Sequence, residues 1–408
     1  MKRALQIIIL LLITAASANA GPLADSLRFS VRGWVRDADS GKPLDAVSVT
    51  IPGTSLATVT NRDGTFVIKS DTQPQAVSFS LLGYSSQTMP VTGGDMRVRL
   101  RKGNIELDPA TVVSGEALSL VRYAISLIAD NAPAEPELFD CFYRETVRKR
   151  QRFIYVSEAV TKVYKSSAAN PVGRDRAAVV KSRLLTSPRR SDTLGVKVLG
   201  GPAMAADLDL VKTRAMLLSE ADLPYYHFEL MPPDVIDGRS QFVIRFSPAV
   251  EDEFALQYGT MYIDRQTFAF TRIETSLDVS DPAKATRAML VSRPSGLRFK
   301  PKEMTLLLNY KQEDGKCRLS YLKTQFRFSC DWRKKLFATE YTAVSEMAVT
   351  NRHTGTDAVP IQRKEEFGSK TSLADKTEFY ADPGFWDAYN IIEPTVGLEQ
   401  AIGRLKKQ

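Results

Sequence analysis

The sequence is poor in the residues from which most catalytic and metal sites are built. It contains two histidines, His227 and His353, in neither H-E-x-x-H nor H-x-x-E-H spacing. A zinc site usually needs three or four ligands, so we expect no metal. A Ser-His-Asp triad would have to use one of these histidines, and no G-x-S-x-G motif is present. Phosphate-binding and dinucleotide-binding glycine motifs are missing as well, so we predict no catalytic residues and no cofactor.

Cysteine and long hydrophobic runs are also scarce. The three cysteines, Cys141, Cys317 and Cys330, leave at least one thiol unpaired within the chain. A Cys317–Cys330 disulfide requires the chain to fold back between them, because the ends of one extended strand lie far apart. The sequence leaves that pairing open. Beyond its first twenty residues the chain has no run of eighteen apolar residues, so we predict no transmembrane helix in the mature protein.

The first twenty residues have the composition of an export signal. They begin with the basic M-K-R, continue with an almost wholly apolar stretch at 4–16, and end in A-N-A, a small-residue cleavage site. We predict a cleaved signal peptide at residues 1–20, with a retained N-terminal anchor as the alternative. The mature chain is therefore expected to be exported.

The charge balance indicates which partners suit the protein. Its net charge of +8 favours anionic lipid or polysaccharide over cationic partners, with ordinary solvated surface charge as the alternative. The basic clusters lack an aromatic stacking pattern, and export argues against nucleic acid as a partner.

The segment 27–102 alternates short strands with turns. The stretches 40–43 (SGKP) and 61–64 (NRDG) have turn composition. Between them, AVSVTI alternates clearly, with Val47, Val49 and Ile51 expected on one side of a strand. About seven short strands in some eighty residues predict a small β-sandwich.

The same residues carry a resemblance to a known family. VRGWVRDADSGKPLDAVSVTIPGTSLATVTNRDGTFVIKS, with Gly33, the 37–44 turn and the T-N-R-D-G-x-F run at 60–66, resembles the carboxypeptidase-regulatory-like domain. This is a prealbumin-like sandwich common in exported Bacteroidota proteins, and in metallocarboxypeptidases it is a non-catalytic module. The resemblance implies a position in the periplasm or at the outer-membrane periphery. It covers roughly a fifth of the chain.

The rest of the chain predicts a connector and a second β-rich domain. Helical spacing of apolar residues at 116–131 predicts a connector helix, ended by the prolines at 133 and 136. Further on, 254–275 reads as a hairpin whose turn is 264–267 (DRQT). Strand-like runs with short turns on both sides favour an antiparallel meander. The predicted domains are 1–20 signal peptide, 27–102 sandwich, 103–138 linker strand and connector helix, 139–350 antiparallel β-rich domain, and 351–408 polar tail with a C-terminal helix.

A second resemblance concerns the whole mature chain. The order of FYRET, SEAV, KSR, the GTMYID hairpin and the FWDAYNIIEP ending resembles a larger uncharacterised family that bears the regulatory-like module. The second domain also resembles the open half-barrels of periplasmic lipoprotein carriers. The expected fold class is therefore mainly β with minor α: a prealbumin-like sandwich, a connector helix, and a large antiparallel sheet or half-barrel with flanking helices.

Charged residues inside strand-like apolar segments are the candidate ligand site. They are Arg144, Glu145, Glu158, Lys181 and Arg183. If these strands line a concave sheet, their charges meet and are only partly solvated, which suits either a ligand site or paired structural ions. Outward alternation along each strand is the simpler alternative.

Three functions remain open from the sequence. The favoured one is an exported, non-catalytic binding or accessory protein of the cell envelope that holds a lipid or polymer in a concave sheet. The first alternative is a hydrolase of envelope polymers that uses Glu145 and Glu158, which must then share a cleft. The second is a structural accessory of the outer-membrane uptake machinery, with an outer-membrane protein as partner, because the same sandwich precedes some transporters.

Overall fold

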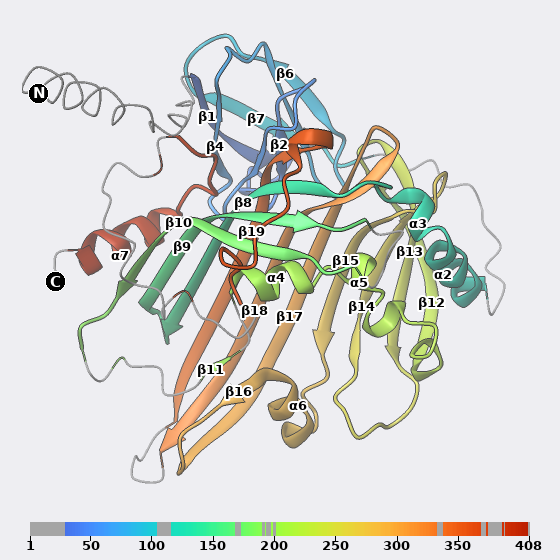
Figure 1. The fold of residues 1–408 in the computed structure, drawn as a ribbon, viewed down its shortest axis with the longest axis vertical. Helices are drawn as coiled ribbons and strands as arrows, with labels where there is room; N and C mark the ends of the chain where they lie inside the picture. Colours follow the sequence, from blue (N-terminus) through green and yellow to red (C-terminus); the bar gives the residue numbers. More distant parts are fainter. Residues whose placement is uncertain are drawn as a thin grey trace, which may run out of the picture.

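The structure, a computed structural model, shows two β-rich units joined by a helical connector (Figure 1). It describes residues 29–103, 116–167, 173–189, 192, 197–198, 201–332, 338–368, 373, 386 and 388–406. The predicted signal peptide at 1–20 lies outside the described residues. The mainly β fold class is confirmed.

The N-terminal unit is a sandwich of two small sheets. Its strands are β1 (Phe29–Asp37), β2 (Ser48–Thr50), β3 (Ala57–Val59), β4 (Thr65–Ser70), β5 (Ala76–Ser80), β6 (Gln87–Pro90) and β7 (Met96–Leu100). They form a three-stranded sheet in the order β4-β1-β7 and a four-stranded sheet in the order β3-β2-β5-β6. Val47, Val49 and Ile51 are all buried between the sheets, as their alternation predicted.

Two glycines explain how the three-stranded sheet forms. A Cβ on Gly33 would lie 2.2 Å from the carbonyl oxygen of Met96, so only glycine lets β7 pair in parallel beside β1. Gly64 has a φ of +75°, and a Cβ there would lie 2.5 Å from the carbonyl oxygen of Val35. Both positions belong to the sequence pattern that indicated the sandwich.

The second unit is one 10-stranded antiparallel sheet in the order β10-β9-β8-β19-β18-β17-β15-β14-β13-β12. Its strands are β8 (Glu137–Lys149), β9 (Arg152–Lys165), β10 (Arg176–Thr186), β12 (Tyr226–Ile236), β13 (Arg239–Pro248), β14 (Gln257–Asp264), β15 (Phe270–Leu277), β17 (Leu297–Glu313), β18 (Lys316–Trp332) and β19 (Thr339–His353). A separate short pair joins β11 (Lys197–Val198) to β16 (Leu290–Ser292). The predicted 254–275 hairpin is present as β14–β15.

The sheet is built from two meanders that meet in its middle. The first, β8 to β10, and the second, β12 to β19, are joined by the pairing of β19 with β8. Between them the chain leaves β10 at one edge of the sheet and returns as β12 at the other. That crossing segment therefore lies over one face, which we call the inner face and which carries Tyr143; the outer face carries Arg144.

Short helices cover the inner face. They are α2 (Glu116–Ser126), α3 (Ile128–Asn131), α4 (Pro202–Asp207), α5 (Leu210–Thr213), and the 3₁₀ turns η2 (Met216–Leu218) and η3 (Leu223–Tyr225). Their apolar side chains share one core with Tyr143 and with inner-face residues of most strands. The predicted connector helix is thus present, with a break at Leu127. Helix α6 (Pro282–Met289) belongs to a separate apolar cluster.

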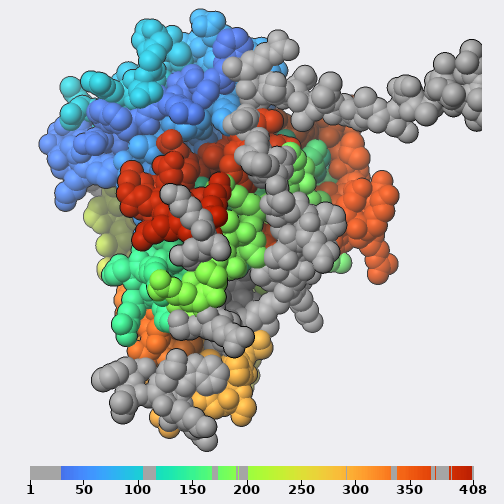
Figure 2. All heavy atoms as spheres, turned by 90° about the vertical axis from the view of Figure 1, so that its left-hand side faces the viewer, coloured from blue at the N-terminus to red at the C-terminus, as the bar shows by residue number. Residues whose placement is uncertain are grey.

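The sandwich rests on the outer face, with the C-terminal part of the chain beside it. Trp386 and residues 388–396, which we call the strap, contact the sandwich and the large sheet through side-chain and main-chain hydrogen bonds. In Figure 2 C-terminal residues lie directly below the sandwich. Helix α7 (Val396–Lys406) follows the strap and packs near β9 and β10.

The predicted polar tail after β19 contains buried apolar residues. After the 3₁₀ turn η4 (Gly355–Asp357), Ile361 and Phe367 are 5% and 3% exposed, and Leu373 is buried as well. Phe367 donates its amide to Ala177 at the edge of β10. The polar composition of this tail therefore does not keep its three apolar side chains from being buried. Among the described residues no helix has the length and apolar character needed to cross a membrane.

Candidate functional site

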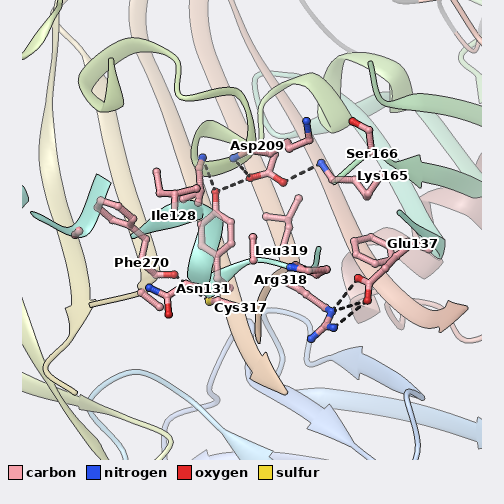
Figure 3. A pocket seen from close by; sticks show the side chains of 18 of the residues that line it. Ile128, Asn131, Glu137, Lys165, Ser166, Asp209, Phe270, Cys317, Arg318 and Leu319 are labelled. Atoms are coloured by element: carbon pink, nitrogen blue, oxygen red, sulfur yellow. Dashed lines mark hydrogen bonds and ion pairs between the residues drawn. The ribbon is translucent and has the colours of Figure 1, made fainter. Parts of the chain in front are cut away.

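An apolar pocket lies on the inner face beneath the α2–α3 connector (Figure 3). Its walls come from the connector, from the α5 region and from strands β8, β9, β15, β17 and β18. The cavity volume is about 60 Å³, which is room for about four to six groups the size of a water molecule. An apolar pocket with a few polar groups is the usual form of a small-ligand site, so this pocket is the candidate site.

The apolar wall follows from two periodicities. Ala124 and Ile128 are four residues apart along the connector, so they share its buried side, where they are 0% and 3% exposed. Phe270 and Leu319 come from strands and point inward, with 2% and 5% exposure. Tyr123 packs edge-on against Phe268 with ring centroids 4.7 Å apart, which fixes the connector over the β14–β15 turn.

One polar end of the pocket is a buried network around Asp209. Lys165 donates to Asp209 at 2.8 Å and pairs with Asp175 at 2.5 Å, while the Tyr310 hydroxyl donates to Asp209 at 2.9 Å. Burial alone would lower the pKa of Lys165, but Asp209 and Asp175 raise it above its ordinary value. Burial, followed by the charge of Asp209, holds the pKa of Tyr310 well above its ordinary value. Lys165 is therefore a fixed cation and Tyr310 a fixed neutral donor.

The other polar end is the ion pair of Glu137 and Arg318. Three guanidinium-to-carboxylate hydrogen bonds of 2.8 to 3.0 Å join them, as Figure 3 shows. Six charged residues line the pocket, three acidic and three basic: Glu135, Glu137, Asp209, Lys165, Lys212 and Arg318. Their formal charges cancel, so the pocket offers no net charge to a ligand. This balance favours a neutral or apolar group.

Cys317 places a thiol in the pocket wall. Its sulfur lies 3.2 Å from the carbonyl oxygen of Phe270. Burial raises the pKa of Cys317 to about 12, so at neutral pH the group is an un-ionised thiol and a poor nucleophile. All three cysteines are free, and Cys317 and Cys330 lie in the same strand, β18. Because β18 is continuous between them, the disulfide left open by the sequence does not form.

Three of the five predicted site residues meet on the outer face instead. Glu158 of β9 stands opposite Arg144 of β8 and Arg183 of β10 in the sheet register. The Arg144 guanidinium donates to Glu158 at 2.7 Å, and Arg183 donates to its second oxygen at 2.5 Å. Burial alone would raise the pKa of Glu158, but the two guanidiniums hold it below the ordinary value.

The pairing continues across two more strands. Glu346 of β19 stands opposite Arg144, and Lys323 of β18 stands opposite Glu346 at 3.4 Å. Five neighbouring strands thus carry charges of alternating sign, which we call the charge ladder: Arg183, Glu158, Arg144, Glu346 and Lys323. The last cation also pairs with Asp45 of the sandwich at 2.9 Å.

The strap lies against the ladder. Arg144 donates to the carbonyl oxygen of Ile392 at 2.6 Å, and Arg183 lies over the ring of Trp386 at 5.1 Å. Lys181, the fourth predicted residue, lies over Tyr389 at 5.9 Å. The chain's own C-terminal segment therefore occupies the position that the sequence reading reserved for a ligand. These contacts support paired structural ions, and a ligand-binding role for the four residues stays a prediction without support from them.

Glu145, the fifth predicted residue, is on the inner face. It stands opposite Ser157, one position out of step with the pair of Arg144 and Glu158, and it accepts a hydrogen bond from Tyr143 at 3.0 Å. Burial raises its pKa, opposed in part by that hydrogen bond. A raised and a lowered carboxyl pKa would suit an acid and a base. Glu145 and Glu158 lie on opposite faces of one sheet, however, so they cannot act together on one bond.

The histidines are not assembled into a reactive centre in the described residues. His353 pairs with Asp140 at 2.7 Å at the end of β19, and His227 is exposed on β12. Within the same described part of the chain, no group of three or more His, Cys, Asp or Glu side chains has a metal-binding arrangement.

Sequence reasoning missed the residues that form the polar ends of the pocket. Lys165 and Asp209 are 44 positions apart, and Glu137 and Arg318 are 181 apart. A usable sign was present in each case: a charged residue at a strand end or beside a short helix, next to apolar neighbours that have to be buried. Which carboxylate meets which cation depends on the β19–β8 junction and the crossing segment, which no local pattern encodes.

Among comparisons with known proteins, the family-model match lies in the N-terminal sandwich region. The family model of the CarboxypepD_reg-like domain matches residues 31–113. Comparison with curated proteins gives no match. Among solved structures, a DUF1329 family protein from Desulfovibrio piger is similar at 10% identity and a TM-score of 0.24, covering 57% of this chain and 93% of that one. A LolA superfamily protein from Nitrosomonas europaea is similar at 13% identity and a TM-score of 0.18, covering 56% and 93%.

Proposed function

We propose that the protein is an exported, non-catalytic binding protein of the cell envelope that holds the apolar end of a lipid or of an acyl-bearing polymer. The pocket beneath the connector is the binding site. The observation that carries this proposal is an apolar cavity whose lining charges cancel, framed at each end by fixed ion pairs. Such a site excludes charge from its centre and rewards burial of an alkyl chain by about 0.8 kcal/mol per methylene group.

The size of the pocket limits the ligand. A cavity of about 60 Å³ accepts a short stretch of one chain rather than a whole phospholipid. The rest of the ligand then extends past the connector, or the connector moves to admit a longer chain. Helix α3 is four residues long, and Lys316 reaches the carbonyl oxygen of Asp130 from an exposed position. The connector thus ends in a short helix that an exposed lysine contacts from outside the pocket.

Two substitutions in one helix test the site. Ala124→Leu fills the pocket, while Ala117→Leu places the same added volume on the buried side of α2 outside the pocket. We expect Ala124→Leu to abolish binding of a fluorescent fatty-acid analogue with little change in the unfolding midpoint. We expect Ala117→Leu to retain binding but lose about 1–3 kcal/mol of stability through overpacking.

Two measurements distinguish a wrong binding site from a wrong function. Mass spectrometry of the mature protein extracted from envelopes should find lipid with the native chain and none with Ala124→Leu. Equal binding by both variants would show that the ligand sits elsewhere. A native preparation that is free of lipid and also ignores the fluorescent analogue would refute the carrier function itself.

A further inference from the structure

The exposed side of the three-stranded sandwich sheet carries a concentration of arginine. Arg32 and Arg36 alternate with buried residues along β1, and Arg97 and Arg99 do so along β7, with Arg101 one step further. All five are exposed. Because alternate side chains of a strand point to the same face, these guanidiniums share one side of the sheet. We call this set the arginine face.

The sheet register brings these cations close together. Arg36 stands directly opposite Arg99, and Trp34 stands opposite Arg97, in the parallel pairing that Gly33 permits. Neighbours along a strand on one face are about 7 Å apart and neighbours across strands about 5 Å. Like charges placed directly opposite each other destabilise a sheet.

None of the five makes an ion pair with an acidic residue in the described part of the chain, although they lie close together on one small sheet. Asp37, the last residue of β1, is buried and accepts hydrogen bonds from Ser40 and Tyr84 instead, and neither Asp39 nor Asp95 makes an ion pair with the five arginines within that same part of the structure. On the large sheet, by contrast, Arg144, Arg183 and Arg318 each meet a carboxylate. The arginine face thus keeps an uncompensated positive charge that an external anion would neutralise.

We propose that the arginine face docks the sandwich on an anionic phospholipid surface. A pleated sheet face presents its guanidiniums in a plane, and lipid phosphates also lie in a plane, so several arginines contact phosphates at once. Trp34, which lies between Arg32 and Arg36 on the same face of β1, adds apolar area, as aromatic residues do at membrane interfaces. Each basic residue near an anionic surface strengthens attachment by about a fivefold factor.

The geometry favours a membrane over an anionic polysaccharide. A sugar polymer is held in a groove, and the five arginines line none of the walls of the pocket described above. Trp34 has the guanidinium of Arg36 over its ring at 4.9 Å, so that ring face is not open for stacking on a sugar. The arginine face would therefore recognise a flat anionic surface through several weak contacts between guanidiniums and phosphates.

Vesicle sedimentation of the mature full-length protein tests the proposal. One set of vesicles is made of phosphatidylcholine alone. The other set is made of phosphatidylcholine with about 40% phosphatidylglycerol, which gives an anionic surface. The variant is Arg97→Gln with Arg99→Gln. The matched control is Arg298→Gln with Lys300→Gln, which removes the same charge at the same strand spacing from exposed positions on β17.

The proposal predicts binding to the anionic vesicles only, weakened about 25-fold in the arginine-face variant and unchanged in the control. Binding should also fall as salt is raised. Equal loss in variant and control would refute the surface, because net charge alone would then explain attachment. Retention on a soluble sulfated polysaccharide without binding to vesicles would refute the membrane as partner, and so would indifference to both.

Discussion

Replacing Glu158 with glutamine probes the charge ladder most directly. The carboxylate is 1% exposed and is the common acceptor of Arg144 and Arg183, whose side chains are 3% and 20% exposed. Glutamine keeps the shape and one acceptor oxygen, but it leaves the two guanidiniums without a charge between them. Breaking a buried pair by neutralising one partner costs about 3–5 kcal/mol. Arg144 keeps Glu346 and the Ile392 carbonyl, so we expect the lower end, about 3 kcal/mol.

The sign of the pH dependence provides a second measurement. The pKa of Glu158 lies below the ordinary glutamate value of 4.5, so its stabilising contribution is complete above that value and declines as pH falls through the lowered pKa. Glu346 behaves in the same way, since Lys323 and Arg144 lower its pKa against the opposing effect of burial. The native protein should therefore lose stability below about pH 4.5 more steeply than Glu158→Gln does.

Urea unfolding at pH 7 and pH 4 measures both effects, with Trp386 fluorescence as a local probe beside Arg183. Glu145→Gln is the matched control, because it lies on the neighbouring strand but faces the opposite side. Burial raises the pKa of Glu145, so its charge opposes folding and its neutralisation should be neutral or stabilising. A change of less than about 0.5 kcal/mol for Glu158→Gln, or a larger loss for Glu145→Gln, would refute this reasoning.

Three further outcomes follow from single contacts. Trp386→Ala removes the ring packed between Arg183 and Phe142, so hydrogen exchange of amides 388–396 should accelerate while the β14–β15 hairpin stays protected; unchanged exchange would mean that the strap is held without it. Gly33→Ala introduces a Cβ against the Met96 carbonyl and should lower the sandwich's melting temperature, and a native-like melt would show that β7 can shift. Cys317, with a pKa of about 12, should react with thiol reagents roughly a thousandfold more slowly at pH 8 than a free cysteine, and faster as pH rises; rapid labelling would show an open pocket.

The sequence predicts the parts of this fold that depend on near neighbours. The β14–β15 hairpin is an example, because Asp264 accepts hydrogen bonds from the amides of Gln266 and Thr267 within its own turn. The sandwich is another, because its turns need glycine at fixed positions. The β19–β8 junction is not of this kind: Tyr341 pairs with Lys149, and nothing near either residue specifies the other.

The candidate site, too, depends partly on local sequence patterns and partly on contacts between distant parts of the chain. Of the strand charges that the sequence singled out, Arg144, Glu158 and Arg183 are in contact in the structure. The sequence left a ligand site and paired structural ions both open, because the alternation of charge across neighbouring strands cannot be seen within any one strand. The apolar wall of the pocket is formed by residues such as Ala124, Ile128 and Phe270, and such residues look the same in sequence whether they fill a core or line a cavity.

The charge ladder and the strap help to hold the sandwich on the large sheet, and they therefore affect how the arginine face and the pocket are placed relative to each other. The arginine face is on the sandwich and the pocket is on the far side of the large sheet, so a ligand taken from a membrane has to pass from one unit to the other. The orientation of the units is fixed by contacts such as Lys323 with Asp45 and Asn61 with the Glu393 carbonyl. Loosening these contacts should leave equilibrium binding of a soluble fatty-acid analogue unchanged but slow its uptake from anionic vesicles. An unchanged uptake rate would mean that membrane docking and pocket loading are independent.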